Sequence, residues 1–328
     1  MRAAVVGAGG RFEVVDLPDP TPGPGELLVR VTACGLCGSD VKSREVMPEG
    51  TVMGHEFGGT VVGAGADVEG WTEGAQVAVL PVIPCGTCEW CRAGYVIHCT
   101  NNQLVGLGGV PGGFAEYAVV SPLCAIPVPR GVEAAHSALV EPYAVGLHAV
   151  RTGDVKAGES VLVIGAGSVG STTTEWARLH GAARITAVDP SEARRASVLE
   201  VGATDAVASL ADAELGAYDV VIECVGKPGL VDQAVMTTRP RSRVVVAGVC
   251  FEPDSLASIN ALMKEVTISF AVYYTPEEFR VVADALSDHR LQPERLLAGR
   301  VGLDALNQAF DDFGSSVGGA KTLIEPRV

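Results

Sequence analysis

The second half of the chain alternates between short apolar segments and helical stretches, which restricts the possible folds more than any other feature. Each apolar segment is a continuous run, which is typical of a strand covered on both faces of a sheet. Repeated strand–helix units form a doubly wound parallel sheet, the Rossmann arrangement. The pattern begins near residue 140, and its apolar segments are VLVIGAG (161–167), ITAVD (185–189), YDVVIECVG (218–226), RVVVAGV (243–249) and VTISFAV (266–272).

A glycine motif follows the first of these strands. GAGSVG (165–170) matches G-x-G-x-x-G, opens a helix, and precedes an acid, Asp189, by nineteen residues. This context is the dinucleotide-binding fingerprint, whereas the glycine pattern alone is a weak signal. The helix N-terminus offers free N–H groups and a partial positive charge to a pyrophosphate.

Each motif position has an expected role. Gly165 permits the tight turn, Gly167 lets the backbone approach the pyrophosphate, and Gly170 lets the helix pack on the strand. Ligands of such sheets lie at the ends of the strands. Further cofactor contacts are therefore expected from Ser168, Val169, Val225 and Gly248.

The cofactor choice depends on Asp189. Its carboxylate would accept hydrogen bonds from ribose hydroxyls and repel a 2′-phosphate, so NAD is expected rather than NADP. Arg194 and Arg195 follow closely and could lie along the adenine. The alternative is an ordinary glycine turn with Asp189 as a loop acid.

The first third is rich in Gly and Pro and carries short apolar runs between turns, which predicts a β-rich domain. The tail has two helical stretches and ends in KTLIEP, which resembles a strand. We expect a first domain over 1–146, a nucleotide-binding domain over 147–284, and a C-terminal return to the first domain over 285–328.

The charge balance excludes several classes of partner. The formal net charge is -15, whereas nucleic acids and anionic membranes require a basic surface. No apolar run is long enough to span a bilayer, and no signal peptide is recognisable. A cytoplasmic protein is therefore expected, in which the nine cysteines are not disulfides.

Four cysteines form a compact group spaced C-x2-C-x2-C-x7-C at Cys85, Cys88, Cys91 and Cys99. Four thiolates complete a tetrahedral zinc shell with no open position, which predicts a structural lobe at about 84–100. Alternatives are an iron–sulfur cluster, four ordinary buried thiols, or His98 as a ligand.

A catalytic zinc instead needs three protein ligands and an open position. CGLCGSD (34–40) offers Cys34, Cys37, Ser39 and Asp40, and MGHEF (53–57) offers His55 and Glu56. VEP at 140–142 supplies Glu141, close to the start of the second domain. A ligand there would place the metal between the domains, facing a nicotinamide.

These motifs together resemble the zinc-dependent medium-chain alcohol dehydrogenases over almost the whole length. The resemblance rests on GPGELLVRV, CGLCGSD, GHE, the cysteine lobe, VEP, and GAGSVG with Asp189. The Glu-Pro pair is similar to the branch of sorbitol, butanediol and threonine dehydrogenases. The resemblance implies a GroES-like β-rich catalytic domain, two zinc ions per chain, and a homodimer or homotetramer formed near 266–272.

The resemblance also implies roles for the candidate residues. Cys37 and His55 correspond to zinc ligands. The third ligand is Glu56, which would bind directly, or Glu141, which would bind directly or through water. Asp40 matches an acid that orients the histidine ligand. Ser39 matches the hydroxyl that passes the alcohol proton outward, although it could also cap a helix starting near Asp40. Cys34 corresponds to no ligand, and Glu141 could instead be a helix-start carboxylate.

The expected reaction interconverts a secondary alcohol, polyol or amino alcohol and its ketone. Zinc would act as a Lewis acid on the alcohol oxygen, and hydride would pass to the nicotinamide. Lys42 stands where many relatives have a relay histidine, so the proton path beyond Ser39 is open.

Two departures concern the substrate. Only seventeen residues separate Cys37 from His55, fewer than in polyol dehydrogenases, and FAVYYTP (270–276) lacks the arginine that those relatives often carry nearby. We therefore expect a less polar secondary alcohol or ketone. Other readings are a carbonyl or enoyl reductase of the same fold, a zinc-binding interaction protein, or a structural protein without turnover.

Overall fold

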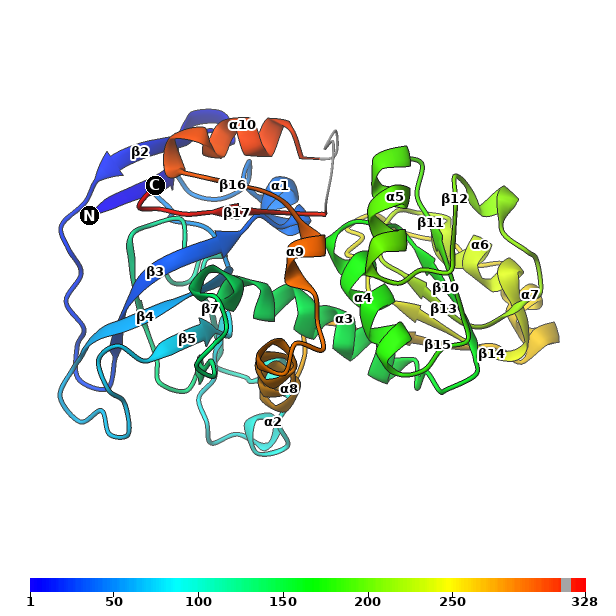
Figure 1. Cartoon of the computed structure of the whole chain (residues 1–328), viewed down its shortest axis with the longest axis horizontal. Helices are drawn as coiled ribbons and strands as arrows, with labels where there is room; N and C mark the ends of the chain where they lie inside the picture. Colours follow the sequence, from blue (N-terminus) through cyan, green and yellow to red (C-terminus); the bar gives the residue numbers. More distant parts are fainter. Residues whose placement is uncertain (314–319) are drawn as a thin grey trace.

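The computed structural model describes residues 1–313 and 320–328, which build two sheet-based halves side by side (Figure 1). One half is a parallel sheet with helices and the other is a mainly antiparallel sheet. The expected α/β fold with a β-rich part is therefore confirmed. The structure contains no helix in these residues that is long and apolar enough to cross a membrane.

The parallel half is built from six strands within the described residues, in the order β12-β11-β10-β13-β14-β15. Its strands are β10 (Ser160–Ile164), β11 (Arg184–Val188), β12 (Asp205–Val207), β13 (Tyr218–Glu223), β14 (Thr238–Val246) and β15 (Thr267–Phe270). The order reverses between β10 and β13, where parallel sheets of this kind bind their ligands.

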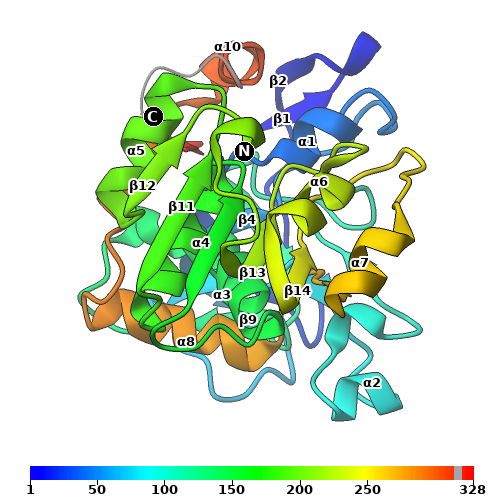
Figure 2. The ribbon, with the colours of Figure 1, turned by 90° about the vertical axis from the view of Figure 1, so that its right-hand side faces the viewer.

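Helices cover both faces of this sheet. Successive side chains of β10 point to opposite faces, and each set packs against a different group of helices. Val161 and Val163 belong to the same apolar cluster as Trp176, whereas Leu162 and Ile164 pack in a second cluster with α6. The helices of this half are α4 (Ser168–Leu179), α5 (Glu192–Val201), α6 (Leu230–Thr237) and α7 (Ser258–Lys264). Figure 2 shows them around the strands.

The other half has seven strands among the described residues, in the order β16-β17-β3-β4-β5-β9 with β8 paired to β3. They are β3 (Leu27–Gly35), β4 (Glu56–Ala64), β5 (Gln76–Val79), β8 (Tyr117–Val120), β9 (Ala125–Pro127), β16 (Leu297–Val301) and β17 (Lys321–Ile324). The last strand, β17, pairs antiparallel with β3, placing Leu323 opposite Gly35. The C-terminal segment thus lies in the sheet of the N-terminal strands.

Shorter elements surround this sheet. The remaining strands are β1 (Arg2–Val6), β2 (Phe12–Asp16), β6 (Val82–Ile83) and β7 (Gln103–Leu104). The remaining α-helices are α1 (Gly38–Ser43), α2 (Glu89–Arg92), α3 (Val140–Thr152), α8 (Pro276–Ser287), α9 (Pro293–Leu296) and α10 (Leu306–Asp311). Short 3-10 turns occupy Ala8–Gly10, Val96–His98, Ala134–Leu139, Leu210–Asp212 and Leu303–Ala305.

Helix α3 joins the two halves and contacts both α4 and α8. Its Tyr143 hydroxyl donates to Glu175 Oε2 of α4 at 2.8 Å, and the other oxygen of Glu175 accepts from the backbone N–H of Gln292 at 2.8 Å. Both side chains are buried, so this network ties α3 to α4 and to the segment before α9.

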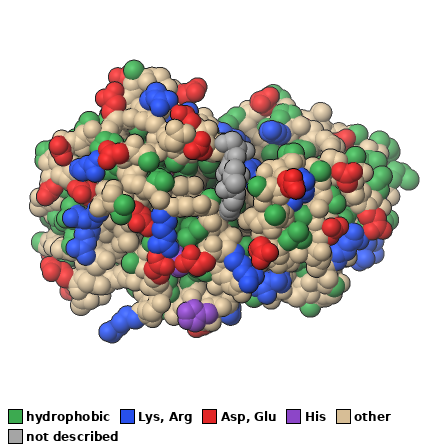
Figure 3. Space-filling view, turned by 45° about the horizontal axis from the view of Figure 1, so that its top comes forward, with side chains coloured by type: hydrophobic (Ala, Val, Ile, Leu, Met, Phe, Trp, Pro, Cys, Tyr) green, Lys and Arg blue, Asp and Glu red, His purple; other side chains and the backbone are tan. Residues whose placement is uncertain are grey.

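On the face in Figure 3, acidic and basic side chains are interspersed. No continuous basic patch is visible on that face, which agrees with the formal net charge of -15.

Candidate active site

A cavity of about 800 Å³ runs between the two halves and contains both predicted sites. Its wall includes Cys37, Ser39, His55, Glu56 and Glu141 at one end. The other end is lined by residues of the nucleotide motif and its surroundings, including Gly165, Gly167, Ser168, Val169, Asp189, Arg194, Val225 and Gly248. Of the residues expected near the cofactor, Gly170 and Arg195 are absent from this wall.

The three motif glycines occupy different environments. Gly165 has a φ of +95°, and a Cβ on Gly170 would lie 1.8 Å from the carbonyl oxygen of Gly165. These two positions therefore exclude side chains for reasons of backbone conformation and helix packing. A Cβ on Gly167 would meet no atom within 4 Å, so its surroundings are open to a ligand.

Asp189 directly follows β11 and is buried. Its Oδ2 accepts from the Ala166 N–H at 2.9 Å and its Oδ1 from the Ser191 N–H at 2.9 Å, which fixes the carboxylate beside the glycine turn. Arg194 lines the cavity, with Nη1 3.9 Å from Asp189 Oδ2. Arg195 instead donates to the carbonyl oxygens of Asp189 and Pro190 and lies outside the cavity wall, contrary to the expectation that both arginines face the adenine.

At the other end, the ligand atoms of Cys37, His55 and Glu56 all lie within 4.8 Å of one another. Cys37 follows β3, and His55 immediately precedes β4, which begins at Glu56. The antiparallel pairing of these strands places Gly35 opposite Glu56, which brings the two segments together. A thiolate, an imidazole and a carboxylate are the ligand types that zinc accepts, so the donor set fits this metal.

Asp40 orients the imidazole. Its Oδ1 lies 3.0 Å from His55 Nδ1, and its Oδ2 accepts from the Cys37 N–H at 3.0 Å. Burial opposes a charged imidazole, but the carboxylate of Asp40 and the thiol of Cys37 together raise the pKa of His55 well above its ordinary value. The other ring nitrogen, Nε2, is therefore the one left free to bind a metal ion.

Ser39 lies inside helix α1, which begins at Gly38. The hypothesis that Ser39 caps a helix starting near Asp40 is wrong, because the bond from the Cys37 N–H to Asp40 closes the first turn earlier. The Ser39 hydroxyl donates to Cys37 Sγ at 3.1 Å and lies 3.5 Å from His55 Nε2. It is therefore adjacent to two candidate metal ligands.

The two candidate acids have different surroundings. Glu56 is buried, and both its oxygens accept from the ammonium of Lys321, at 2.7 and 2.6 Å. Glu141 lies outside the three-residue group, and its Oε1 accepts from the Tyr274 hydroxyl at 2.9 Å. Burial, and then the charge of Glu56, raise the pKa of Glu141 to about 7.

Sequence reasoning missed several residues of this site. Lys321 is fully buried, although it is the first residue of strand β17. A single lysine directly before the apolar strand residues TLI is the sequence signal that could have pointed to a buried ion pair. Glu223 ends β13 and accepts from the N–H groups of Val225 and Gly226, which fixes the loop at the cavity wall. Lys42 donates to the Val249 carbonyl at 2.8 Å and so joins the two halves across the cavity.

The second thiol group lies on a separate lobe between β6 and β7. Cys85, Cys88, Cys91 and Cys99 form one group of ligand atoms, with Cys88 Sγ 3.4 Å from Cys91 Sγ. The N–H groups of Cys85 and Asn101 point at Cys99 Sγ, which suits a thiolate. His98 is not part of the group and instead packs against Trp90. Cys34 belongs to neither group and is a buried core residue.

Comparison with known proteins relates both halves of the chain to dehydrogenase families. Residues 23–130 match the family model of the alcohol dehydrogenase GroES-like domain, and residues 168–288 match that of zinc-binding dehydrogenases. L-galactonate-5-dehydrogenase of Escherichia coli K12 is 30% identical over 305 residues, covering 89% of each chain. Human sorbitol dehydrogenase is 29% identical, covering 96% of this chain and 93% of its own length.

Solved structures agree with this assignment. The crystal structure of a zinc-binding dehydrogenase from Sinorhizobium meliloti 1021, bound to NADP, superimposes with a TM-score of 0.92. It is 31% identical and covers 99% of both chains. The chain therefore belongs to the zinc-dependent medium-chain alcohol dehydrogenases, in the branch that includes sorbitol dehydrogenase.

Proposed function

We propose that this zinc-type alcohol oxidoreductase binds two zinc ions per chain and uses NAD to interconvert a weakly polar secondary alcohol and its ketone. The single observation that carries the proposal is the group of Cys37, His55 and Glu56 in the same cavity as the glycine turn. An alcohol bound beside this group would face the cofactor end of the cavity. We propose that the catalytic unit comprises 1–146 and 285–328, and the nucleotide unit 147–284.

Glu56 is the proposed third ligand, because its carboxylate lies within the three-residue group and Glu141 does not. Zinc bound there would supply Lewis acidity toward the substrate oxygen. Asp40 holds the His55 tautomer, and Lys321 balances the charge of Glu56. Glu141, fixed by Tyr274, stays close enough to act on the site through water.

The Ser39 hydroxyl is the proposed first acceptor of the alcohol proton. It lies next to Cys37 Sγ and His55 Nε2, where the substrate oxygen would bind. The Lys42 ammonium donates to the Val249 carbonyl, so it is not in position to accept this proton. We propose that the proton passes from Ser39 directly to solvent.

NAD is the proposed cofactor because Asp189 presents a buried, fixed carboxylate to the cavity. A 2′-phosphate there would meet a negative charge, although Arg194 lies 3.9 Å away and could offset part of it. The NADP in the Sinorhizobium relative makes the phosphorylated cofactor the alternative that must be measured.

The substrate end of the cavity favours a weakly polar compound. Apart from the metal-site residues, its wall there includes Leu107, Val272, Tyr273 and Phe313. Apolar walls with few polar groups bind a substrate mainly through burial of carbon. Rates with NAD on sorbitol, threonine, 2,3-butanediol and a hydrophobic secondary alcohol test this, and a clear preference for sorbitol would contradict it.

A second copy of the chain is the proposed partner of strand β15. This strand ends the parallel sheet, so its outer backbone groups are unpaired within the described residues. Phe270, Leu262 and Met263 are 76%, 69% and 76% exposed around it. In Figure 3, apolar side chains gather at the right-hand end, where α7 lies in Figure 1. We propose a homodimer or homotetramer in the cytoplasm, where the free thiols would stay reduced.

Zinc content and turnover in two matched variants test the proposal. Cys37→Ser should remove one zinc equivalent and abolish alcohol oxidation while the cysteine lobe keeps its ion. Cys88→Ser should remove the other equivalent and lower the unfolding temperature. Loss of both equivalents, or of neither, in Cys37→Ser would show that the cavity does not hold the catalytic metal.

A further inference from the structure

A third group of metal-ligand side chains lies on the catalytic half, away from the cavity. Glu133, His136 and Glu294 each offer one ligand atom, and these three atoms all lie within 4.8 Å of one another. None of the three residues lines the cavity between the halves. The group is therefore separate from both the candidate active site and the cysteine lobe.

The imidazole of His136 is the buried part of this group. Its side chain is only 9% exposed, and its Nε2 lies 3.0 Å from Glu294 Oε1 and 3.4 Å from Glu133 Oε2. The side chains of Glu133 and Glu294 are 47% and 66% exposed, so both carboxylates face water. A buried ring nitrogen is thus directed between two carboxylates that a hydrated ion can reach.

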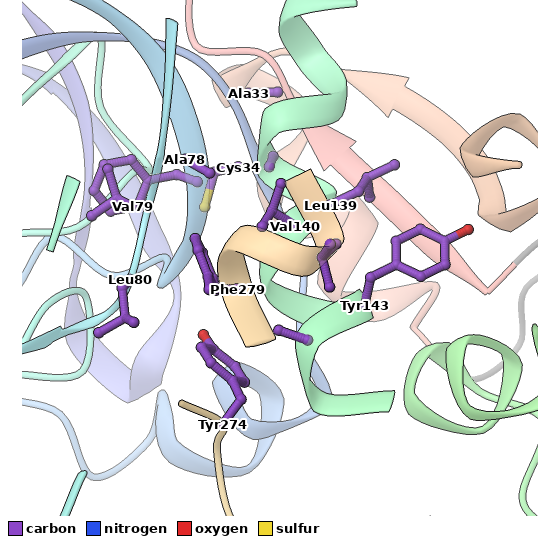
Figure 4. Close-up of a cluster of buried hydrophobic side chains, with 14 of the residues drawn as sticks. Ala33, Cys34, Ala78, Val79, Leu80, Leu139, Val140, Tyr143, Tyr274 and Phe279 are labelled. Atoms are coloured by element: carbon purple, nitrogen blue, oxygen red, sulfur yellow. The ribbon is translucent and has the colours of Figure 1, made fainter. Parts of the chain in front are cut away.

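The backbone of this histidine is closely packed. The residue lies in the 3-10 turn Ala134–Leu139, which runs directly into α3. Leu139 and Val140 belong to the buried apolar cluster in Figure 4. A Cβ on Gly58 of β4 would lie 2.2 Å from Ser137 Oγ, so the turn leaves no space above the sheet. The imidazole is therefore in position before an ion binds.

Charge also favours a cation at this place. Arg300 of β16 pairs with Glu133, and it lies 3.6 Å from Glu294 Oε1 and 3.5 Å from Glu325 Oε1. Three carboxylates and one guanidinium leave two negative charges when His136 is neutral. A divalent cation would cancel this charge.

The carboxylate of Glu133 divides its oxygens between two partners. Its Oε1 accepts from Arg300 Nη1, whereas its Oε2 is the oxygen nearer to His136 Nε2. An ion bound through Oε2 would leave the bond to Arg300 in place, and ligand carboxylates are commonly hydrogen-bonded in this way. Arg300 Nη2 lies 3.4 Å from His136 Nε2, so it would turn toward Glu325 to make room for the ion.

We propose that Glu133, His136 and Glu294 form a further metal site, which binds a divalent transition-metal ion such as zinc. Zinc accepts an imidazole nitrogen and carboxylate oxygens, and water would complete the shell. The ion would join the turn before α3 to α9, and so fasten the C-terminal segment to the catalytic half. This inference is independent of the proposed activity.

Zinc binding by the whole protein tests the site. Bound zinc per chain is measured by equilibrium dialysis against zinc buffers for the wild type, His136→Gln and Glu294→Gln. One binding step should move to at least about tenfold higher free zinc in each variant, because each lacks one of three protein ligands. Over the same range, zinc should raise the unfolding temperature of the wild type more than that of either variant.

His289→Gln is the matched control, because it makes the same change at an exposed histidine outside the group. Its binding curve should match that of the wild type. If Glu294→Gln, at an exposed carboxylate, also binds zinc as the wild type does, the site is overturned and the group is an ion-pair network around Arg300. A shift of the same step in His289→Gln would show adventitious binding and would overturn it as well. Comparison between variants makes both outcomes independent of the zinc bound elsewhere and of alcohol oxidation.

Discussion

The ammonium of Lys321 lies 2.6 Å from Oε2 of Glu56, and both side chains are buried in the interior of the catalytic half. The third proton of the ammonium is also satisfied, by the Leu36 carbonyl at 3.0 Å. Burial alone would lower the pKa of Lys321, but the contact with Glu56 and the charges of Cys37 and Glu141 together raise that pKa above its ordinary value. The pair therefore brings a charged carboxylate into the core next to His55.

Lys321→Met should lower the free energy of unfolding by about 3–5 kcal/mol, because it leaves an unpaired carboxylate in the core. Denaturant titration measures this loss. Lys156→Met, which breaks an exposed pair with Asp154, should cost less than about 1 kcal/mol. The double variant with Glu56→Gln should be more stable than Lys321→Met alone, and equal losses in both would contradict the ion-pair explanation.

Asp40→Asn should weaken zinc binding at the cavity site by about 10–100-fold, because it removes the carboxylate that orients His55. Activity titrated against a zinc buffer measures the affinity of this site separately from the cysteine lobe. Asp154→Asn, on the surface, is the matched control. Normal affinity in Asp40→Asn would show that the 3.0 Å contact to His55 does not support the metal.

Asp189→Ser should decrease the ratio of kcat/KM for NAD to that for NADP by about tenfold or more, since it removes both a ribose acceptor and a charge that repels phosphate. Initial rates with each cofactor give the ratio. Asp205→Ser, at the exposed start of β12, should leave it unchanged. If the wild type already prefers NADP, the charge of Arg194 outweighs that of Asp189 at the 2′-phosphate, and the proposed cofactor is wrong.

Phe270→Lys should shift the protein to monomers, because it places a charge on the exposed edge of the sheet. Light scattering over a range of protein concentrations measures the mass. Val46→Lys, at a residue that is 79% exposed on the other half, should keep the wild-type mass. A wild type that is monomeric at all concentrations would contradict the proposed assembly.

Glu175→Gln should change how stability depends on pH. Burial raises the pKa of the Glu175 carboxyl above its ordinary value of 4.5. Between these two values the folded state holds a proton that the unfolded state releases, so this residue lowers wild-type stability as pH rises. The variant lacks this titration.

The free energy of unfolding of the wild type minus that of Glu175→Gln should therefore fall with rising pH, starting near pH 4.5, and level off above the raised pKa. Denaturant titrations across pH 4 to 8 provide the curve. A difference that increases with pH in this range would show that Glu175 is better stabilised as an anion in the folded protein.

The sequence by itself determined the parallel sheet, the glycine turn, the cysteine lobe and the positions of Cys37, His55 and Glu56. These features depend on local spacing, on glycine conformation and on apolar periodicity, all of which can be read along the chain. Ser39 shows the limit of this reading, because the end of a helix depends on which side chain closes its first turn.

Only the tertiary structure decided the surroundings of those residues. Lys321 reaches Glu56 across 265 positions because β17 pairs with β3, and Tyr274 reaches Glu141 across 133 positions because the chain leaves β15 toward the other half. The charge of a buried acid and the orientation of a phenol depend on such distant partners. Long-range pairing brings them together, and no local pattern records it.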